Sequence, residues 1–263
     1  MTPAQPLRLA LLGDPVTHSR SPAIHRAALR ETGTEGTYEA IRADEQVLAR
    51  SIEQLREGTM TGINVTMPLK AAAAAMADEL SDLARTANSV NTLRYRRRVV
   101  QAHSTDAVAF QELFADVARF PRDAQLLVLG SGASARAALA AADRREAFVS
   151  ARSPEKAREL HLSFGAAGVL DWGHGLARSI VINATPVGMN GDRLPDAITR
   201  QAAALIDLPY GSAVTPAIAD ARLMGKHCAD GVEFLARQAR ASFEWWTGSS
   251  LDLEHLLRAA RNV

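Results

Sequence analysis

Three short polar segments of the sequence lie where strands are expected to end. The segment His18–Pro22 carries two hydroxyls, Ser19 and Ser21, on one tight loop, which suits a carboxylate ligand. The segment Asn64–Lys70 ends an expected strand with a hydroxyl, a rigid proline and then a lysine. Asp106 follows an expected hairpin, and a lysine beside an aspartate at a strand end can exchange protons with a bound molecule. Together the three segments predict an acid–base site for a small acid.

A glycine-containing loop predicts a nucleotide site. Residues 130–136 fit the pattern G-x-G-x-x-A, directly after an expected strand and before an expected helix. Gly130 would form the turn, and Gly132 would let the backbone approach a pyrophosphate. Backbone N–H groups at Ala133 and Ser134, where the helix begins, would hold the diphosphate. A plain strand-to-helix turn is the alternative interpretation.

The end of the next expected strand indicates which dinucleotide would bind. Enzymes that use NAD usually place an acid there for the ribose 2′-hydroxyl, but residues 150–153 contain no carboxylate. Arg152 can pair with a 2′-phosphate through its planar fork, and Ser153 and Lys156 can add donors. The sequence therefore predicts NADP, with an ordinary surface arginine as the alternative.

The elements that must position these residues form two α/β parts. Strands are expected at 9–12, 37–41, 62–66, 125–129, 147–150, 180–183 and 205–208. Their alternation with helices predicts a parallel sheet in the first part and a doubly wound nucleotide-binding pattern in the second. Arg96–Arg98 is expected to be a hairpin turn, and residues 110–119 a helix. Ser21 is expected to cap a helix, with Pro22 at its first position. Two final helices, 234–246 and 251–260, either cap the nucleotide unit or return to the first part.

The composition of the 263 residues is that of an ordinary globular protein, with 47% hydrophobic residues, 22% charged residues and a net charge of +1. No broad basic field favours nucleic acid or anionic membranes. Cys228 is the only cysteine, so no internal disulfide can form and a reducing compartment is expected. The apolar stretch Leu9–Leu12 is too short for a signal peptide or a membrane span, so we expect a cytoplasmic protein. The seven histidines lack metal-binding spacing, which predicts that no metal is bound.

Over nearly all its length the chain resembles the shikimate dehydrogenase family. The matching stretches are 13–15, 18–22, 24–25, 64–70, 88–93, 105–106, 130–136, 183–189, 215–216, Gly231 and Gln238. The chain departs from the usual family pattern at Ser104, Ala107, Asn88-Ser89, Ala133 and Phe234, but each catalytic group is present.

This resemblance implies roles for individual residues. Lys70 would be the proton donor or acceptor at a ring hydroxyl, with Asp106 as its partner. Ser19 and Ser21 would bind the substrate carboxylate, with Tyr210 near it. The residues implied for the ring hydroxyls are Thr66, Asn91, Asp106 and Gln238; those for the 2′-phosphate are Arg152 and Ser153; those near the nicotinamide are Met189 and Gly231.

The resemblance also implies the activity and the domain organisation. The activity would be NADP-dependent interconversion of shikimate and 3-dehydroshikimate, a step of aromatic amino acid biosynthesis, in a monomer or homodimer. A substrate-binding catalytic domain would span residues 1–106, completed by the C-terminal helices at 232–263, and a Rossmann NADP-binding domain would span 107–231. Quinate or aminoshikimate dehydrogenase activity is the alternative within the same scaffold. A catalytically idle NADP-binding paralogue is the other, and an intact Lys70 and Asp106 argue against it.

Overall fold

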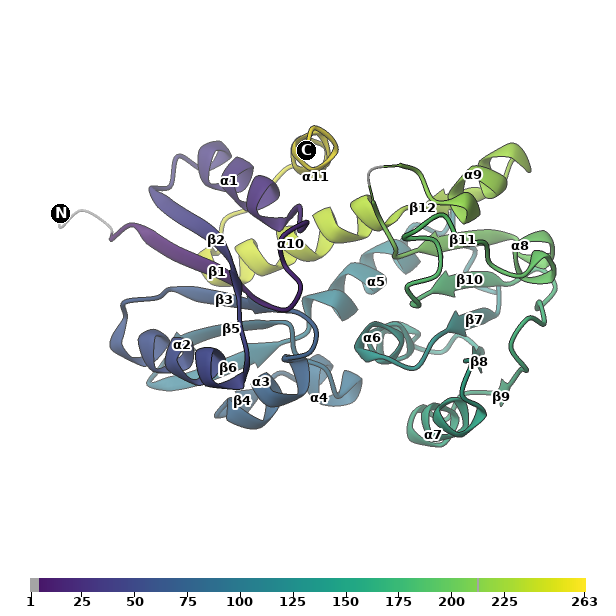
Figure 1. The fold of residues 1–263 in the computed structure, drawn as a ribbon, viewed down its shortest axis with the longest axis horizontal. Coiled ribbons are helices and arrows are strands. Elements are labelled where there is room, and N and C mark those ends of the chain that lie inside the picture. Colours follow the sequence, from purple (N-terminus) through teal and green to yellow (C-terminus); the bar gives the residue numbers. More distant parts are fainter. Residues whose placement is uncertain (1–4, 212) are drawn as a thin grey trace. The chain divides into compact units, whose positions relative to one another are not determined.

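The computed structural model describes residues 5–211 and 213–263 and divides the chain into two compact units (Figure 1). The first unit comprises the chain up to Val108 together with Leu235–Val263, and the second comprises Ala109–Phe234. Both boundaries fall inside helices, α5 (Thr105–Ala115) and α10 (Gly231–Thr247). The residues of each of these two helices are therefore divided between the units.

The first unit contains a mixed sheet with the strand order β2-β1-β3-β5-β6-β4. The strands are β1 (Leu7–Gly13), β2 (Gly36–Arg42), β3 (Gly62–Val65), β4 (Glu79–Leu80), β5 (Thr92–Arg96) and β6 (Val99–His103). Strands β2, β1 and β3 pair in parallel as expected, and β4 pairs in parallel with β6, but β5 is antiparallel to both β3 and β6. The predicted hairpin makes β5 and β6 antiparallel: Arg97 and Arg98 both have positive φ, which forms a tight turn that reverses the chain directly.

Helices cover this sheet and supply much of its core. They are α1 (Ser21–Glu31), α2 (Glu45–Glu57), α3 (Lys70–Met76), α4 (Asp82–Ala87), α11 (Leu253–Arg261) and the C-terminal part of α10. In α2, Leu48, Ile52 and Leu55 recur on one face and are fully buried, each stabilising the fold by about 1.5–3 kcal/mol. Asp44 caps the start of this helix by accepting from Val47 N at 2.8 Å.

The C-terminal helices return to the first unit, as one of the two expected arrangements has it. Helix α11 packs on α1, and Trp246 of α10 donates from Nε1 to Leu93 O at 3.0 Å. Gly62 of β3 makes room for α10, because a Cβ atom there would lie 2.5 Å from the Trp246 ring. The sequence pattern predicted both helices and left two destinations open, and the family resemblance implied the return to the first part that the structure has.

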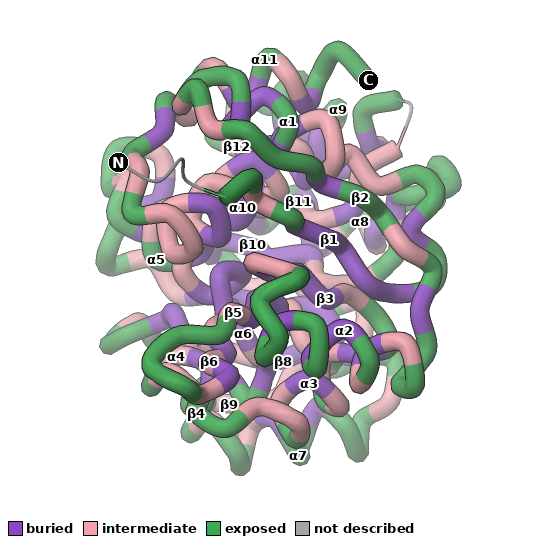
Figure 2. The backbone as a smooth tube through the Cα atoms, turned by 90° about the vertical axis from the view of Figure 1, so that its left-hand side faces the viewer, coloured by how far each residue is buried: buried purple, intermediate pink, exposed green. Residues whose placement is uncertain are grey.

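The second unit has a parallel sheet with the order β12-β11-β10-β7-β8-β9, so the expected doubly wound fold is confirmed. Its strands are β7 (Leu126–Leu129), β8 (Ala147–Ser150), β9 (Gly168–Val169), β10 (Ile180–Asn183), β11 (Ala204–Asp207) and β12 (His227–Ala229). Its helices are α6 (Ala133–Ala141), α7 (Pro154–Phe164), α8 (Asp196–Gln201) and α9 (Pro216–Leu223). Four central strands, β7, β10, β11 and most of β8, are buried. In the first unit most of β1 is buried as well (Figure 2).

One helix begins earlier than the sequence predicted. Helix α5 starts at Thr105 rather than Phe110 and ends at Ala115, after which residues 116–120 form a turn. The reason is a tertiary hydrogen bond at its first residue, described below. None of the helices in the described residues is long and apolar enough to cross a membrane.

Candidate active site

Two loops approach each other closely at the carboxyl ends of β1 and β3. This contact brings together the serine segment and the lysine segment of the expected site. Thr66 N donates to Leu12 O, and Asp14 N donates to Met67 O, both at 2.9 Å. A Cβ atom at Gly13 would lie 2.3 Å from Thr66 Cγ2 and 2.8 Å from Met67 O, so only glycine permits this contact. The serine loop after β1 and the lysine loop after β3 therefore leave the sheet side by side.

The serine loop differs in detail from its predicted form. Ser21 is the first residue of α1 rather than its cap, and Ser19 Oγ accepts from Ser21 N at 3.2 Å. Ser21 is buried and Ser19 half-buried. Arg20 between them reaches away and donates to Ala260 O of α11 at 3.1 Å. Both hydroxyls thus sit on a short segment that the C-terminal helix holds.

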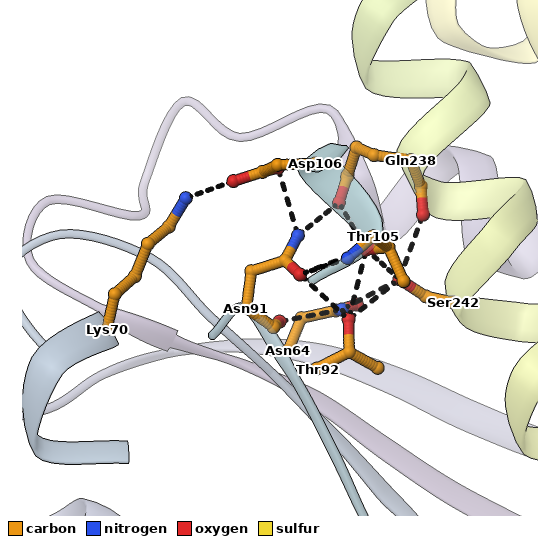
Figure 3. A network of polar contacts seen from close by, with 8 residues as sticks. All are labelled: Asn64, Lys70, Asn91, Thr92, Thr105, Asp106, Gln238 and Ser242. Carbon is orange, nitrogen blue, oxygen red and sulfur yellow. Dashed lines mark hydrogen bonds and ion pairs between the residues drawn. The ribbon is translucent and has the colours of Figure 1, made fainter. Parts of the chain in front are cut away.

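Lys70 and Asp106 form an ion pair between two helix starts (Figure 3). Lys70 is the first residue of α3, and Asp106 is the second residue of α5. Their side chains are only 16% and 8% exposed. The carboxylate lies at the N-terminal end of α5, where the helix dipole favours a negative charge. The structure therefore joins the lysine and the aspartate that the sequence suggested as a proton-transfer pair.

Asn91 holds the second oxygen of this carboxylate. Thr105 N donates to Asn91 Oδ1 at 2.7 Å, and because an N–H group can only donate, the amide nitrogen must face the other way. Asn91 Nδ2 then donates to Asp106 Oδ1 at 2.9 Å and to Gln238 Oε1 at 3.1 Å. Both amide hydrogens of Asn91 are therefore used within the protein, and the same bond from Thr105 starts α5.

Behind Asn91 lies a second layer of buried polar residues that sequence reasoning missed. Ser242 Oγ lies 3.0 Å from Asn64 Nδ2, 2.9 Å from Thr105 Oγ1 and 3.1 Å from Thr92 Oγ1, and it donates to Gln238 O (Figure 3). Two signals could have pointed to this layer. Asn64 is a polar residue inside a wholly buried strand, and Ser242 follows Gln238 by one helical turn, on the same face. Buried polar groups of this kind need partners.

A buried aromatic pair extends this layer. Tyr38 donates its hydroxyl to Asn64 Oδ1 at 2.8 Å, and the His25 ring stacks on Tyr38 with centroids 4.1 Å apart. Burial lowers the pKa of His25 to about 3, so this histidine is neutral at physiological pH. It contributes packing rather than acid–base chemistry.

The remaining substrate-site residues are placed as follows. Thr66 follows β3 directly and is half-buried, and Gln238 lies on α10 in the first unit. Tyr210 follows β11 in the second unit.

The glycine loop of the second unit has the features of a diphosphate site. Gly130 has φ +106°, and a Cβ atom there would lie 2.8 Å from Ala184 O, so glycine is required. Gly132 precedes α6, and no side chain among the described residues caps that helix start. The first N–H groups of α6, from Ala133 and Ser134 onward, are thus available to an anion. Ala135 is fully buried, as expected for the helix–sheet contact position.

The segment after β8 places the expected 2′-phosphate residues around one helix start. Arg152 is exposed and forms no ion pair with any residue that the structure describes. Ser153 caps α7: its Oγ accepts from Lys156 N at 3.4 Å and donates to Glu155 Oε2 at 2.9 Å. The backbone N–H of Glu155 and the Ser153 hydroxyl lower the pKa of Glu155. The sequence prediction overlooked this carboxylate, which already engages the Ser153 hydroxyl hydrogen.

The two residues expected near the nicotinamide occupy different settings. Met189 is 55% exposed in the loop after β10. Gly231 begins α10, where a Cβ atom would lie 2.2 Å from Leu208 O and 2.7 Å from Pro209 O. Gly231 therefore allows the helix start to lie directly against the loop after β11.

Known proteins resemble the chain in sequence and in fold. The family model for the shikimate dehydrogenase substrate binding domain matches residues 11–93. Shikimate dehydrogenase (NADP(+)) of Dinoroseobacter shibae is 34% identical, with 95% of each chain covered. That of Thermus thermophilus is also 34% identical, with 98% of each covered. A crystal structure of the Thermus thermophilus enzyme, in complex with NADP(H) and shikimate, aligns with a TM-score of 0.88 over 97% of this chain and 99% of that one, at 33% identity.

These alignments cover nearly the whole of this chain and of each relative. The chain belongs to the shikimate dehydrogenase family.

Proposed function

We propose that the chain catalyses the NADP-dependent interconversion of shikimate and 3-dehydroshikimate, a step of aromatic amino acid biosynthesis. The observation that carries this proposal is the Lys70–Asp106 pair, held by Asn91, in a chain of this family. An idle paralogue would gain nothing from keeping a largely buried ion pair whose desolvation is costly.

The residues of the first unit would bind the acid and move its proton. The hydroxyls of Ser19 and Ser21 would bind the carboxylate, and Thr66, Asn91, Asp106 and Gln238 would lie at the ring hydroxyls. During oxidation the deprotonated amine of Lys70 would take the proton from the C3 hydroxyl and become an ammonium group, and during reduction that ammonium group would return the proton to the C3 oxygen. Asp106 would keep the ammonium group oriented, because Asn91 fixes the opposite carboxylate oxygen. We also propose Tyr210 as a residue near the substrate carboxylate.

The second unit suits the cofactor. When bound, NADP supplies the hydride acceptor or donor at C4 of its nicotinamide. Gly130, Gly132 and the N–H groups of Ala133 and Ser134 would hold its diphosphate, as the uncapped start of α6 supports. The further residues that we propose are Arg152, Ser153 and Lys156 for the 2′-phosphate and Met189 and Gly231 for the nicotinamide.

Three broader assignments belong to the same proposal. Residues 1–106 and 232–263 would form the substrate-binding domain and residues 107–231 the NADP-binding domain, close to the division between the two compact units. We place the enzyme in the cytoplasm, because its lone cysteine suits a reducing compartment. We expect it to act as a monomer or homodimer.

The direct test is to add shikimate and NADP to the purified protein and record the NADPH absorbance. Parallel reactions with quinate and with NAD identify the preferred acid and cofactor. NADPH formation from shikimate, lost in the Lys70→Ala variant, is the expected result. Absence of NADPH formation from shikimate would refute the proposal.

A further inference from the structure

Asp207 is a buried carboxylate that the proposed proton transfer does not use. It ends β11 and its side chain is 0% exposed. Its described hydrogen-bond partners are neutral: Asn183 Nδ2 lies 2.6 Å from Oδ1, and Thr215 Oγ1 donates to Oδ2. Burial raises the pKa of Asp207 to about 6. A buried carboxylate without a cation destabilises a fold, so this one calls for a functional explanation.

Asn183 connects this carboxylate to the next loop in one fixed orientation. Thr185 N donates to Asn183 Oδ1 at 3.1 Å, and Thr185 Oγ1 donates to the same oxygen at 2.6 Å. Because an N–H group only donates, Oδ1 must face Thr185, and Nδ2 must face acceptors. Those acceptors are Asp207 Oδ1 and Val187 O, the latter at 2.9 Å. The carboxylate therefore fits the one side of the amide that needs an acceptor.

The loop held in this way carries Met189. Thr185 Oγ1 accepts from Val187 N at 3.2 Å, which folds the loop back over Asn183. Gly188 has φ +110°, and a Cβ atom there would lie 3.4 Å from Thr215 Cβ, so the loop also lies against the residue that caps α9. Asp207 accordingly links the ends of β10 and β11 and the start of α9 beneath one exposed loop.

We propose that Asp207 is a positioning residue for the cofactor: acting through Asn183, it fixes the loop Thr185–Met189 against which the nicotinamide binds. The identity of the bound molecule rests on the proposed function. The fixing of the loop rests on the hydrogen bonds alone.

A contrast between two substitutions tests the link. Asp207→Ala removes the acceptor that faces Asn183. Asp207→Asn can keep an oxygen toward Asn183 while its NH₂ group donates to the Thr215 hydroxyl. We expect Asp207→Ala to raise the KM for NADP by at least about tenfold, with the KM for shikimate changed less than about twofold, and Asp207→Asn to stay within about threefold of the unmodified enzyme. Asp196→Ala, which removes an exposed carboxylate of α8 in the same unit, is the matched control.

Hydrogen exchange of the peptide 184–190 provides a readout that needs no activity. Its amides at Thr185 and Val187 are bonded to Asn183 Oδ1 and Thr185 Oγ1, so Asp207→Ala should speed their exchange by about tenfold while the α6 peptide is unchanged. If Asp207→Ala does not fold, Thr185→Val removes the hydroxyl that bonds Asn183 Oδ1 and Val187 N, and it should also raise the KM for NADP. Unchanged exchange and an unchanged KM for NADP in a folded variant would overturn the proposal. Failure of the unmodified protein to oxidise shikimate would instead count against the proposed function, and the exchange result would still decide the role of Asp207.

Discussion

Asn91 Nδ2 lies 2.9 Å from Asp106 Oδ1, while Thr105 N holds the carbonyl end of the same amide. The amide is thus oriented by a backbone group of the helix that carries the aspartate. This arrangement leaves Asp106 Oδ2 for Lys70, so the position of the ammonium group depends on Asn91 as well as on Asp106.

The first prediction exploits this orientation. Asn91→Asp keeps the acceptor for Thr105 N but replaces a donor with a carboxylate oxygen beside Asp106 and Gln238. Two carboxylates in contact repel each other unless they share a proton. Asp106 would then no longer present a full negative charge to the ammonium group of Lys70. We expect kcat to fall by at least about tenfold in steady-state kinetics. Asn262→Asp, at the exposed end of α11, should leave kcat unchanged. A kcat for Asn91→Asp close to that of the unmodified enzyme would contradict the role of the amide.

The second prediction separates proton transfer from charge at Lys70. Lys70→Ala should lower kcat by roughly 10²–10⁴ with a much smaller change in KM, because proton transfer matters in the transition state. Lys70→Arg keeps a positive charge beside Asp106, but a guanidinium does not give up its proton at working pH. We therefore expect Lys70→Arg to be nearly as slow as Lys70→Ala. A kcat of Lys70→Arg close to that of the unmodified enzyme would show that Lys70 acts through its charge and does not transfer the proton.

The sequence predicted the buried parallel strands closely, and the reason is physical. Strands such as β8 (Ala147–Ser150) and β10 (Ile180–Asn183) coincide with their expected ranges, because strands buried on both faces are continuous apolar runs between turn residues. The start of α5 was placed too late, because its first N–H group is satisfied by Asn91, 14 positions earlier in the chain. The local spacing of apolar residues cannot predict a hydrogen bond between residues that far apart in the sequence.

The same limit explains which part of the site was foreseen. Lys70 and Asp106 could be paired in advance because both follow strands whose ends meet in an α/β fold. The position of Ser242 one turn after Gln238 was a signal, but its contacts with Asn64 and Thr92 could not be predicted, since they join residues 178 and 150 positions apart. Nor could the sequence show that Ser153 already donates to Glu155, which depends on the rotamers at one helix start.

The third prediction concerns cofactor choice. Arg152 is exposed after β8, where it can reach a 2′-phosphate that only NADP carries. Arg152→Ala should therefore raise the KM for NADP by about tenfold or more and leave the weaker reaction with NAD nearly unchanged. Arg158→Ala, which removes another exposed arginine further along α7, is the matched control. An equal rise in the KM for NADP and in the KM for NAD would show that Arg152 stabilises the loop and does not bind the 2′-phosphate.

The last prediction follows from the buried charge of Asp207. Burial raises its pKa from an ordinary value of 3.8 to about 6 in the folded protein. The folded state therefore binds this proton more tightly than the unfolded state does. The resulting stabilisation is complete below about pH 4 and is lost as the pH rises through about 6. The difference between the two pKa values corresponds to about 3 kcal/mol in the free energy of unfolding.

Asp207→Asn removes this titration while keeping a group of the same shape. The free energy of unfolding of the unmodified protein, relative to that of Asp207→Asn, should therefore fall by up to about 3 kcal/mol between pH 4 and pH 7 and then level off. Urea unfolding of both proteins at closely spaced pH values measures this difference directly. Asp196→Asn, at an exposed site, should show no comparable fall. A constant difference across the range would mean that the Asp207 carboxyl titrates near its ordinary pKa, and that the donors from Asn183 and Thr215 compensate fully for its burial.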